Sequence, residues 1–528
     1  MEKNTLRLIR IVLAILVFTP ILLYFCDFAG WLPKQLHGIL HIQVVPAILT
    51  VNIAILVGLF LLTILFGRIY CSVICPLGIL QDIIAWFTQR GKKKNRKRRW
   101  YHYAKPQTIL RYSLLGICVV FLIFGITTPV LLLDPYSNFG RIAVNLFRPV
   151  VMEGNNLLNW IVLKFHIYHL YYVTIYTVTA WSLAFAAVVL LIVGIMALLR
   201  GRLFCNTICP VGTLLGLFSR FSLFRIELDD SKCNRCGLCA YACKSQCINS
   251  KEKSVDHSRC VSCFNCLDRC KQDGINYRFA FSRSSQPVII EKGKISHRVT
   301  NQTNEIGMTR RSFLVTSAAL TATLPVIPAW AQAKKEEIDV TKLTPITPPG
   351  SKSLEHFKKY CTACHLCITH CPQQILKPAG FNYGINYAFK PHMVFYEMAY
   401  CNYECTVCTK VCPTGAIQEL TRPEKKVTQV GIAQFVKNRC IVATEGTSCG
   451  ACSEHCPTQA VRMEPFHDDL TIPHVYDELC IGCGGCESIC PARPIKAINV
   501  LANAVHQTAQ KPPEEKKETE KKDLDFGF

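Results

Sequence analysis

Residues 233–243 read Cys-Asn-Arg-Cys-Gly-Leu-Cys-Ala-Tyr-Ala-Cys, and the same spacing of two, two and three residues returns at residues 260–270. Three closely spaced thiolates can grip one [4Fe-4S] cubane while the fourth thiolate reaches a second cubane. We therefore predict two clusters between these runs. The first is assigned to Cys233, Cys236, Cys239 and Cys270, and the second to Cys243, Cys260, Cys263 and Cys266.

Two features depart from the usual bacterial ferredoxin run. Lys244 and Lys271 stand where a proline normally follows the fourth cysteine, and Cys247 is a spare thiol that could compete with Cys243 as a ligand. Paired zinc sites are the alternative interpretation. Zinc motifs seldom use runs of four cysteines, so the spacing favours iron–sulfur clusters.

Four further cysteine sets lie toward the C-terminus. They are Cys361, Cys364, Cys367 and Cys371; Cys401, Cys405, Cys408 and Cys412; Cys440, Cys449, Cys452 and Cys456; and Cys480, Cys483, Cys486 and Cys490. The outer two sets are regular, whereas the inner two are stretched in their first gap. This symmetry predicts nested pairing, the first set with the fourth and the second with the third, each pair exchanging its last cysteine. Adjacent pairing is the alternative. Either scheme adds four [4Fe-4S] clusters and gives six in the chain.

Two other uses of these cysteines are weighed. Cys361-Thr-Ala-Cys364-His365 matches the C-x-x-C-H signature of covalent haem attachment. Haem attachment would remove two cluster ligands from a complete run, so a cluster is the preferred interpretation. A disulfide scaffold is the other alternative, and the odd total of 31 cysteines excludes complete intramolecular pairing.

The apolar content points to a membrane. Half of the 528 residues are hydrophobic, and the mean hydropathy is +0.24, which excludes a disordered chain, a collagen and an ordinary cytosolic enzyme. Four runs approach the roughly 20 residues that a transmembrane helix needs: residues 8–28, 45–66, 108–133 and 170–199. The basic run at residues 90–99 follows the second of them. Positive charges favour the cytoplasmic side, so we expect the N-terminus and residues 226–308 to be cytoplasmic. This explanation is simpler than a nucleic-acid patch, and no nucleic-acid partner is expected.

A second targeting signal lies in mid-chain. Residues 309–315 read Thr-Arg-Arg-Ser-Phe-Leu-Val, followed by an apolar stretch that ends in two A-x-A sequences at residues 329–333. This layout predicts a twin-arginine export signal, with residues 334–528 in the periplasm. An arginine pair before an ordinary buried helix is the alternative. Whether the segment is cleaved or kept as an anchor stays open. Cluster assembly needs a reducing compartment, which suits export in the folded state.

An internal repeat carries the remaining motif. Gly67-Arg-x-x-Cys71-x3-Cys75-Pro-x-Gly78 follows the second run, and Gly201-Arg-x-x-Cys205-x3-Cys209-Pro-x-Gly212 follows the fourth. If helical, each pair lies on one helix face. We predict that the four thiols meet at the cytoplasmic membrane edge as a metal or redox-active site. Inert buried thiols at a packed turn are the alternative, and Cys26 and Cys118 are expected to be packing residues.

These motifs predict an α-helical membrane domain, with four spans and a twin-arginine segment, joined to α+β dicluster ferredoxin-like domains. The expected divisions are a membrane domain at 1–225, a cytoplasmic two-cluster ferredoxin at 226–281, a linker at 282–308, the signal or anchor at 309–333, an exported four-cluster domain at 334–506 and a disordered tail at 507–528.

The first 280 residues resemble the NapH-type membrane iron–sulfur proteins, a group that includes the membrane portions of NosR-like and FixG-like proteins. Residues from about 305 onward resemble the NapG/MauM-type exported ferredoxins, so the chain looks like a fusion of the two. The resemblance implies a quinol dehydrogenase in the inner membrane. It would pass electrons to a periplasmic redox enzyme, of which molybdenum nitrate reductase is the best-known acceptor.

We therefore expect oxidation of menaquinol or ubiquinol, with electron transfer through the clusters. Quinol oxidation releases protons, and the candidate acceptors near the outer face are Asp27, His37, His41, Asp134, His166 and His169. The alternatives are an electron-supplying maturation factor for a periplasmic metalloenzyme and a passive membrane scaffold. No glycine-rich nucleotide loop supports NADH or flavin chemistry. How electrons would cross the bilayer does not follow from the sequence.

Overall fold

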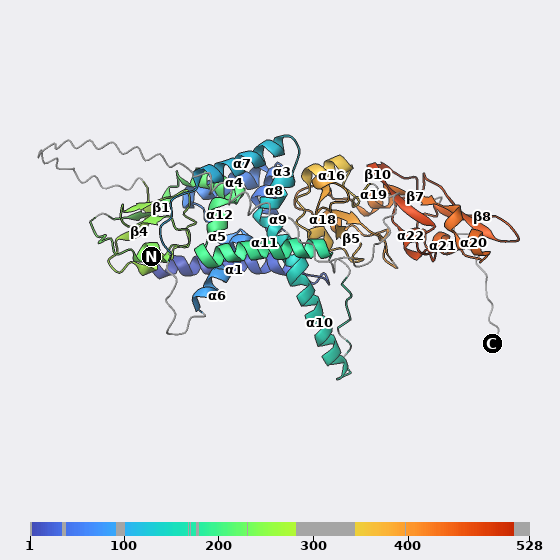
Figure 1. The fold of residues 1–528 in the computed structure, drawn as a ribbon, viewed down its shortest axis with the longest axis horizontal. Helices are drawn as coiled ribbons and strands as arrows, with labels where there is room; N and C mark the ends of the chain where they lie inside the picture. Colours follow the sequence, from blue (N-terminus) through green and yellow to red (C-terminus); the bar gives the residue numbers. More distant parts are fainter. Residues whose placement is uncertain are drawn as a thin grey trace, which may run out of the picture. The chain divides into compact units, whose positions relative to one another are not determined.

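The computed structural model describes residues 3–33, 38–90, 101–166, 168, 170–175, 179–229, 231–280, 344–396 and 398–511 (Figure 1). The described residues before position 281 and after position 343 pack into one unit. The predicted linker, the twin-arginine segment, most of the predicted tail, His37 and His169 lie outside the described residues.

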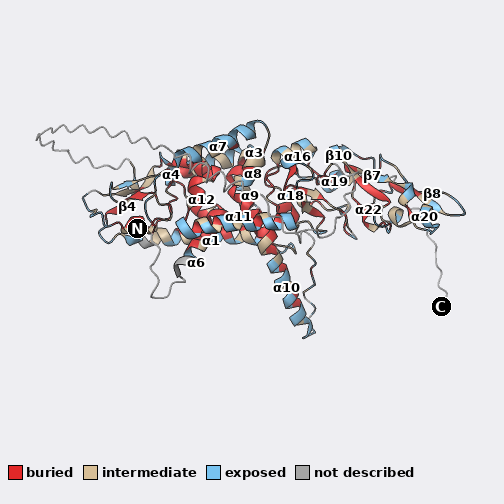
Figure 2. Cartoon of the chain, in the orientation of Figure 1, coloured by how far each residue is buried: buried red, intermediate tan, exposed pale blue. Residues whose placement is uncertain are grey.

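Two helices are long and apolar enough to cross a membrane, α1 (Lys3–Cys26) and α11 (Ala180–Arg200). Their outward side chains are apolar and exposed, as at Leu16 and Leu191. Figure 2 shows exposed residues along both helices, with the buried core behind them. These helices therefore offer apolar surface to their surroundings, as lipid-facing helices do.

The other two predicted spans are divided. The run at 45–66 forms α3 (Val44–Leu49) and α4 (Ile53–Phe66), separated at Val51, whose φ is +52°. The run at 108–133 forms α7 (Thr108–Ile123) and α8 (Thr128–Leu133), with Gly125 at φ +74° between them. The prediction that a span begins at residue 170 is wrong, because α11 begins at Ala180 and residues 170–175 are not helical. Among the described residues, only two of the four predicted spans are single long helices.

Each C-x3-C-P motif is a break between two helices. In the first half α5 (Tyr70–Val73) precedes α6 (Pro76–Arg90), and in the second half α12 (Leu203–Thr207) precedes α13 (Pro210–Ser219). Proline at the first helical position starts α6 and α13, since its fixed φ suits that position. The first cysteine of each motif lies in the short helix, and the second lies in the break, directly before the next helix. The motif is therefore not one continuous helix, and the prediction of a shared helix face is wrong.

The connection between α8 and α11 contains α9 (Pro135–Ile142), a π-helical turn (η2, Ala143–Phe147) and α10 (Arg148–Leu163). The short helix α2 (Gly38–His41) follows α1. Asp134 caps α9, since its carboxylate accepts hydrogen bonds from the backbone N–H of Ser137 at 2.8 Å and from the Ser137 hydroxyl at 2.6 Å.

Residues 224–280 form a small α+β domain. Strands β1 (Phe224–Leu228) and β4 (Ile275–Phe279) pair antiparallel, with Leu228 opposite Ile275. The cysteine loops lie between them, with α14 (Leu238–Ala242), β2 (Ile248–Asn249), β3 (Ser254–Val255) and η3 (Leu267–Arg269). This is the arrangement expected for a two-cluster ferredoxin.

Residues 344–511 contain two successive subdomains built in a similar way. We call them the first stage (residues 344–427) and the second stage (residues 428–511). The first stage contains α16 (Leu354–Tyr360), α17 (Leu366–Thr369), β5 (Leu376–Pro378), η5 (Ile385–Tyr387), β6 (Pro391–Met393), α18 (Val407–Val411) and α19 (Arg422–Val427). The second contains β7 (Thr428–Phe435), η6 (Lys437–Arg439), α20 (Ile441–Glu445), α21 (Ala451–Glu454), β8 (Val461–Pro465), β9 (Thr471–Val475), α22 (Gly485–Ile489) and β10 (Ile498–Thr508). Strand β10 pairs with β7 as far as Thr508, so the domain continues past the predicted boundary at 506.

Helix α1 contacts residues 224–280 near its N-terminus and residues 344–511 at its C-terminus. We call these two segments the ferredoxin parts. Near its N-terminus, Arg7 Nη1 lies 2.5 Å from Asp268 Oδ2. At its C-terminus, the hydroxyl of Thr369 donates to the carbonyl oxygen of Phe25 at 3.3 Å. The 18 residue steps along the helix from Arg7 to Phe25 span about 27 Å, close to the roughly 30 Å hydrocarbon core of a bilayer.

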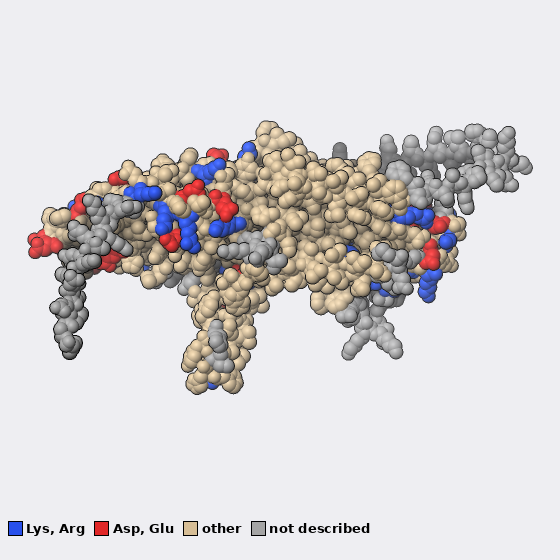
Figure 3. All heavy atoms as spheres, turned by 180° about the vertical axis from the view of Figure 1, so that it is seen from behind, with Lys and Arg blue, Asp and Glu red and all other residues tan. Residues whose placement is uncertain are grey.

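Charged side chains are distributed unevenly over the surface. On the face drawn in Figure 3, Lys, Arg, Asp and Glu gather over the two ferredoxin parts, and the surface between them shows almost no charged side chain. An uncharged surface between charged ends is typical of proteins that cross a bilayer, since a charge in the hydrocarbon region is costly.

Candidate iron–sulfur sites

The first predicted cluster of residues 224–280 has its four cysteines around one cavity. Cys233, Cys236, Cys239 and Cys270 all face it. Burial raises the pKa of the Cys239 thiol to about 11, and the charges of the other three thiols add to the shift. A group of thiols that resist ionisation alone is well suited to a cationic iron centre, which keeps them as thiolates.

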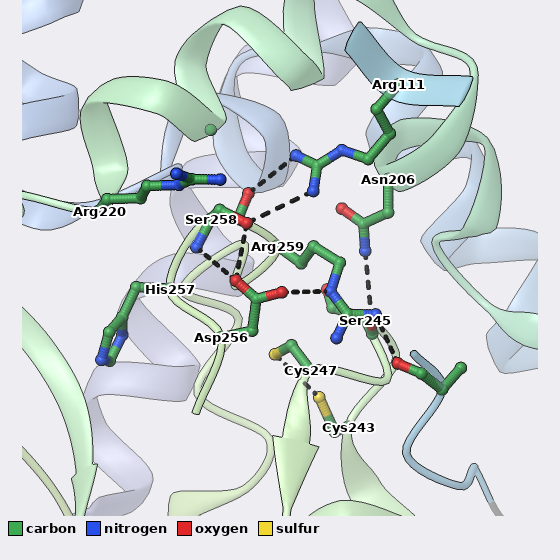
Figure 4. Close-up of polar contacts among 12 residues, drawn as sticks. Arg111, Asn206, Arg220, Cys243, Ser245, Cys247, Asp256, His257, Ser258 and Arg259 are labelled. Carbon is green, nitrogen blue, oxygen red and sulfur yellow. Dashed lines mark hydrogen bonds and ion pairs between the residues drawn. The ribbon is translucent and has the colours of Figure 1, made fainter. Parts of the chain in front are cut away.

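The second set also converges. Burial raises the pKa of the Cys266 thiol well above its usual value. The charges of four neighbouring thiols add to this, and those of Cys263, Cys243 and Cys260 contribute more than that of Cys239. Cys247 lies among them, with its Sγ 3.5 Å from the Sγ of Cys243 (Figure 4). Both groupings have the composition predicted for the two cytoplasmic clusters, and the spare Cys247 is beside the second.

Polar contacts tie this ferredoxin to the helical part. Arg111 on α7 donates to the Ser258 carbonyl at 3.3 Å, and the Asn206 amide donates to the Ser245 carbonyl at 3.2 Å (Figure 4). Asp256 is held in turn by Arg259, whose Nε lies 2.6 Å from its carboxylate. The loops that carry the second cluster's cysteines are therefore fixed against the C-x3-C-P region.

The nested pairing predicted for the C-terminal sets is wrong. Burial raises the pKa of the Cys367 thiol well above its usual value. Four neighbouring thiols add to this, and those of Cys361, Cys364 and Cys412 contribute more than that of Cys408. A separate cavity is lined by Cys371, Cys401, Cys405 and Cys408. The first set thus exchanges its last cysteine with the second set.

The third and fourth sets are paired in the same way. Cys440, Cys449, Cys452 and Cys490 line one cavity. Burial raises the pKa of the Cys486 thiol well above its usual value, with contributions from Cys483, Cys480 and Cys456. Adjacent pairing follows because each stage of the fold closes around two consecutive sets. The two stages meet where the Cys401 N–H donates to the Cys483 carbonyl at 2.9 Å.

The first C-terminal cysteine set lies against α9 and the π-helical turn η2. A Cβ on Gly140 of α9 would lie 2.3 Å from the Cys364 carbonyl oxygen. His365 contacts Asn145 of the π-helical turn, with Nδ1 3.4 Å from the amide nitrogen, and its Nε2 is 2.9 Å from the Phe389 carbonyl oxygen. Burial lowers the pKa of His365 to about 3. Nδ1 thus contacts the helical part and Nε2 contacts the ferredoxin part that carries His365, so both ring nitrogens have polar partners.

The four thiols of the repeated motif are brought together. Cys71, Cys75, Cys205 and Cys209 are each 3% exposed, and Cys209 lies within electrostatic range of the other three. Donors point at the sulfurs: Gln81 Nε2 is 3.3 Å from Cys205 Sγ, and the Gly212 N–H is 3.3 Å from Cys209 Sγ. Hydrogen bonds to sulfur are a usual feature of cluster ligands, so the site fits an iron–sulfur centre.

Sequence reasoning gave no role to the arginine of each motif. Arg68 Nη2 lies 3.7 Å from Cys71 Sγ, and Arg202 Nη1 lies 2.5 Å from the Cys71 carbonyl oxygen. The signal was available, because the arginine recurs with the cysteines in both halves of the repeat.

The quinol-site candidates are dispersed. Asp134 is buried as a helix cap, Asp27 accepts backbone hydrogen bonds such as that from Gly30 at 2.8 Å, and His166 is exposed. His41 ends α2 and is partly buried. Within the described ranges, no hydrogen bond or ion pair joins His41 to Asp134.

A mononuclear metal site is not preformed. In the part of the chain that the structure describes, no group of three or more His, Cys, Asp or Glu side chains converges on a single ion position. Zinc would require sulfurs about 2.3 Å from one ion.

Comparison with known proteins agrees with this chemistry. Residues 48–95 and 181–228 match the family described as 4Fe-4S binding domain, and residues 360–425 and 446–495 match the 4Fe-4S dicluster domain. The first dicluster match covers the first two C-terminal cysteine sets completely, and the second covers the last two sets except Cys440. No solved structure matches the chain.

Individual relatives are ferredoxin-type proteins. The chain is 30% identical over 152 residues to the methylamine utilization ferredoxin-type protein MauM of Methylobacillus flagellatus (28% of this chain, 64% of that protein). It is 29% identical over 153 residues to ferredoxin-type protein NapG of Escherichia coli (28% and 65%). MauM of Methylorubrum extorquens is 30% identical over 152 residues (28% and 67%). The chain belongs to the MauM-type ferredoxin family.

The match covers only part of each protein. The chain spans 64% and 65% of the length of the first two relatives, and they align with less than a third of this chain. Membership therefore establishes an iron–sulfur electron-transfer protein of the ferredoxin type. The predicted fusion with a NapH-type membrane protein rests on the sequence motifs and belongs to the proposal below.

Proposed function

We propose that this chain is a membrane-bound quinol dehydrogenase that passes electrons to a redox enzyme on the outer side of the membrane. The observation that carries the proposal is the contact of α1 with one ferredoxin part near Arg7 and with the other at Phe25. The two parts are about one bilayer thickness apart along this helix. Residues 226–281 then lie in the cytoplasm, and residues 344–511 lie in the periplasm.

The residues that would hold the cofactors are the cysteine groups described above. The six predicted ferredoxin-type clusters, when bound, supply one-electron redox chemistry. We propose that Cys71, Cys75, Cys205 and Cys209 hold a seventh centre, supported by their convergence and by the 4Fe-4S match over both halves. The protein buries these thiols and excludes water from them.

A continuous core supports transfer across the membrane. One buried cluster of side chains contains Cys263 beside the cytoplasmic site, the four motif thiols, and Cys361 and Cys367 of the outer site. Aromatic rings fill part of it: the Phe25 and Tyr136 centroids are 5.7 Å apart, and the Phe18 and Phe139 centroids are 5.5 Å apart. The chain thus packs the two sides together without an intervening gap in this core.

Quinol is the proposed donor because it is a lipid-soluble two-electron reductant, and α1 and α11 expose apolar surface suited to lipid. Each quinol oxidised gives one quinone, two protons and two electrons, and the electrons leave one at a time. The relatives' names mention methylamine utilization and ferredoxin-type proteins. We propose a periplasmic redox enzyme as the acceptor for this chain, with a molybdenum nitrate reductase as one candidate.

The test is anaerobic mixing of the lipid-reconstituted protein with a menaquinol analogue, followed by freeze-quench EPR. The proposal predicts prompt reduction that a quinone-site inhibitor abolishes. Intact clusters that stay oxidised in the presence of excess quinol would contradict it, and the maturation-factor alternative would then take precedence.

A further inference from the structure

The two halves of the motif repeat exchange their arginines. Arg68 of the first half donates from Nη2 to the carbonyl oxygen of Cys205 at 3.0 Å. Arg202 of the second half donates from Nη1 to the carbonyl oxygen of Cys71 at 2.5 Å. Both arginines are almost completely buried. Each half therefore uses its own arginine to fix the first cysteine of the other half.

Two glycines make room for the exchange. A Cβ on Gly78 would lie 2.4 Å from the Cys71 carbonyl oxygen and 2.7 Å from Arg202 Nη1. A Cβ on Gly212 would lie 2.3 Å from the Cys205 carbonyl oxygen and 2.7 Å from an Arg68 nitrogen. No other residue type fits at these distances without moving the backbone or the guanidinium. The final glycine of each motif is thus explained by the arginine of the other motif.

The exchange is symmetric in its backbone contacts but not in its charges. Arg202 Nε pairs with the carboxylate of Asp82 at 2.8 Å, a partner that it shares with Arg10 and Lys244. Arg68 Nη1 instead donates to the Asn206 amide oxygen at 2.8 Å and to the Ser258 carbonyl oxygen at 3.0 Å. Within the described ranges, Arg68 has no carboxylate partner.

The unbalanced charge of Arg68 is directed at the thiols. Its Nη2 lies 3.7 Å from the Sγ of Cys71. A buried cation without a counter-ion is costly unless an anion is near, and four cysteine thiolates would supply that anion. A positive charge beside such a centre favours its more negative, reduced form, because net charge and hydrogen bonds to sulfur set the reduction potential.

We propose that Arg68 is the positioning and charge-compensating residue of the centre shared by the four motif thiols, and that it raises the reduction potential of this centre. Arg202, with its charge held by Asp82, positions the Cys71 backbone and has a smaller effect on the potential. The electron taken up by the centre is delivered and withdrawn by its redox neighbours, and Arg68 transfers no proton or group. This inference rests on the seventh centre proposed above.

The experiment is an anaerobic redox titration of the purified full chain, with dithionite and ferricyanide as titrants and EPR detection. Arg68→Gln is the main variant, because a neutral amide facing carbonyl and amide groups leaves no stranded charge. Arg111→Gln is the matched control. Arg111 is equally buried and also donates to the Ser258 carbonyl, at 3.3 Å, but it has no thiol contact within the described ranges.

We expect Arg68→Gln to lower the ratio of reduced to oxidised centre about tenfold at a fixed potential, which equals about 59 mV for a one-electron couple. Arg68→Lys, which keeps the charge, should recover most of this ratio. Arg111→Gln and Arg202→Gln should change it much less. A centre that is present in the Arg68→Gln protein with an unchanged potential would overturn the inference, as would an equal shift in the Arg111→Gln protein.

If the Arg68→Gln protein cannot be purified with its clusters, the reduction potential is measured in the Arg68→Lys protein instead. A lowered potential in that protein, which keeps the positive charge, would contradict charge compensation. A Cys71→Ser protein separates the two proposals. Loss of one cluster's iron, with the other clusters intact, shows that the shared centre exists and leaves only the role of Arg68 in question. No loss of iron would contradict the shared centre itself.

Discussion

The ammonium group of Lys244 lies 3.3 Å from a carboxylate oxygen of Asp82 on α6. Lys244 follows Cys243, at the position where ferredoxin runs usually have proline. Lys244 therefore forms an ion pair with the helical part, which a proline at this position could not form. Arg10 and Arg202 pair with the same carboxylate, so a single buried Asp82 joins α1, the second motif and the cytoplasmic ferredoxin.

Removing the charge of Asp82 should be strongly destabilising. Asp82→Asn leaves three cations facing one another without an anion, and breaking a buried ion-pair network costs about 3–5 kcal/mol. Glu227→Gln is the control, because its 2.8 Å pair with Arg225 is partly exposed and worth at most about 1 kcal/mol. Anaerobic thermal unfolding measures both. An Asp82→Asn protein as stable as the Glu227→Gln protein would show that this network does not hold the parts together.

Adjacent pairing of the outer cysteine sets is testable by iron content. Cys367 and Cys412 belong to one predicted cluster, so the double variant Cys367→Ser/Cys412→Ser should lose the iron of one cluster. Cys490 belongs to another, so Cys367→Ser/Cys490→Ser should lose the iron of two. Nested pairing predicts the reverse order, and anaerobic iron and sulfide analysis distinguishes the two outcomes.

Gly140 should be essential for docking of the outer ferredoxin part. In Gly140→Ala the new methyl group would meet the Cys364 carbonyl oxygen at 2.3 Å and a Phe25 ring carbon at 2.9 Å, and such overpacking costs about 1–3 kcal/mol. We expect retained clusters but slowed reduction of the outer clusters by a quinol analogue. Gly154→Ala on α10 has nothing within 4 Å of its Cβ and is the control. Equal reduction rates in the two variants would contradict the docking contact.

The stability of the outer part should depend on pH through His506 on β10. Its Nε2 is 2.8 Å from the Thr347 hydroxyl, and burial lowers its pKa to about 4 from an ordinary 6.5. The unfolded chain therefore gains a proton first as pH falls, and the stability present above about pH 6.5 is lost progressively toward pH 4. From pH 7.5 to 5.5, the wild type should lose about 1.4 kcal/mol more than His506→Gln.

Thermal unfolding of the two proteins at both pH values measures this difference. His467→Gln, at an exposed position, is the control and should behave as the wild type. Identical acid sensitivity of the wild type and the His506→Gln protein would show that this histidine does not contribute.

The cysteine groupings of the cytoplasmic part could be predicted because the x2 gaps in residues 233–243 and 260–270 fix the local geometry. The pairing of the four C-terminal cysteine sets could not be predicted, because the longer gaps before Cys405 and Cys449 do not indicate which loops share a β-sheet. Hydropathy located the apolar runs but not the breaks at Val51 and Gly125, where backbone conformation interrupts helices of uniform composition.

The exchange between Arg68 and Cys205 lay beyond sequence reasoning for another reason. The repeat showed that both halves carry the same residues, but not that each half would reach into the other. Such a contact depends on how the halves pack, and it becomes visible only when Gly212 is seen beside the Arg68 guanidinium.

The proposed function requires electrons to cross the membrane through this chain. The direct measurement uses sealed vesicles that contain the protein and trapped cytochrome c, with dithionite added only outside under anaerobic conditions. We expect rapid reduction of the trapped haem iron by the wild type, and slow reduction in vesicles with the Cys75→Ser or Cys209→Ser protein. Reduction by the wild type no faster than in protein-free vesicles would contradict it.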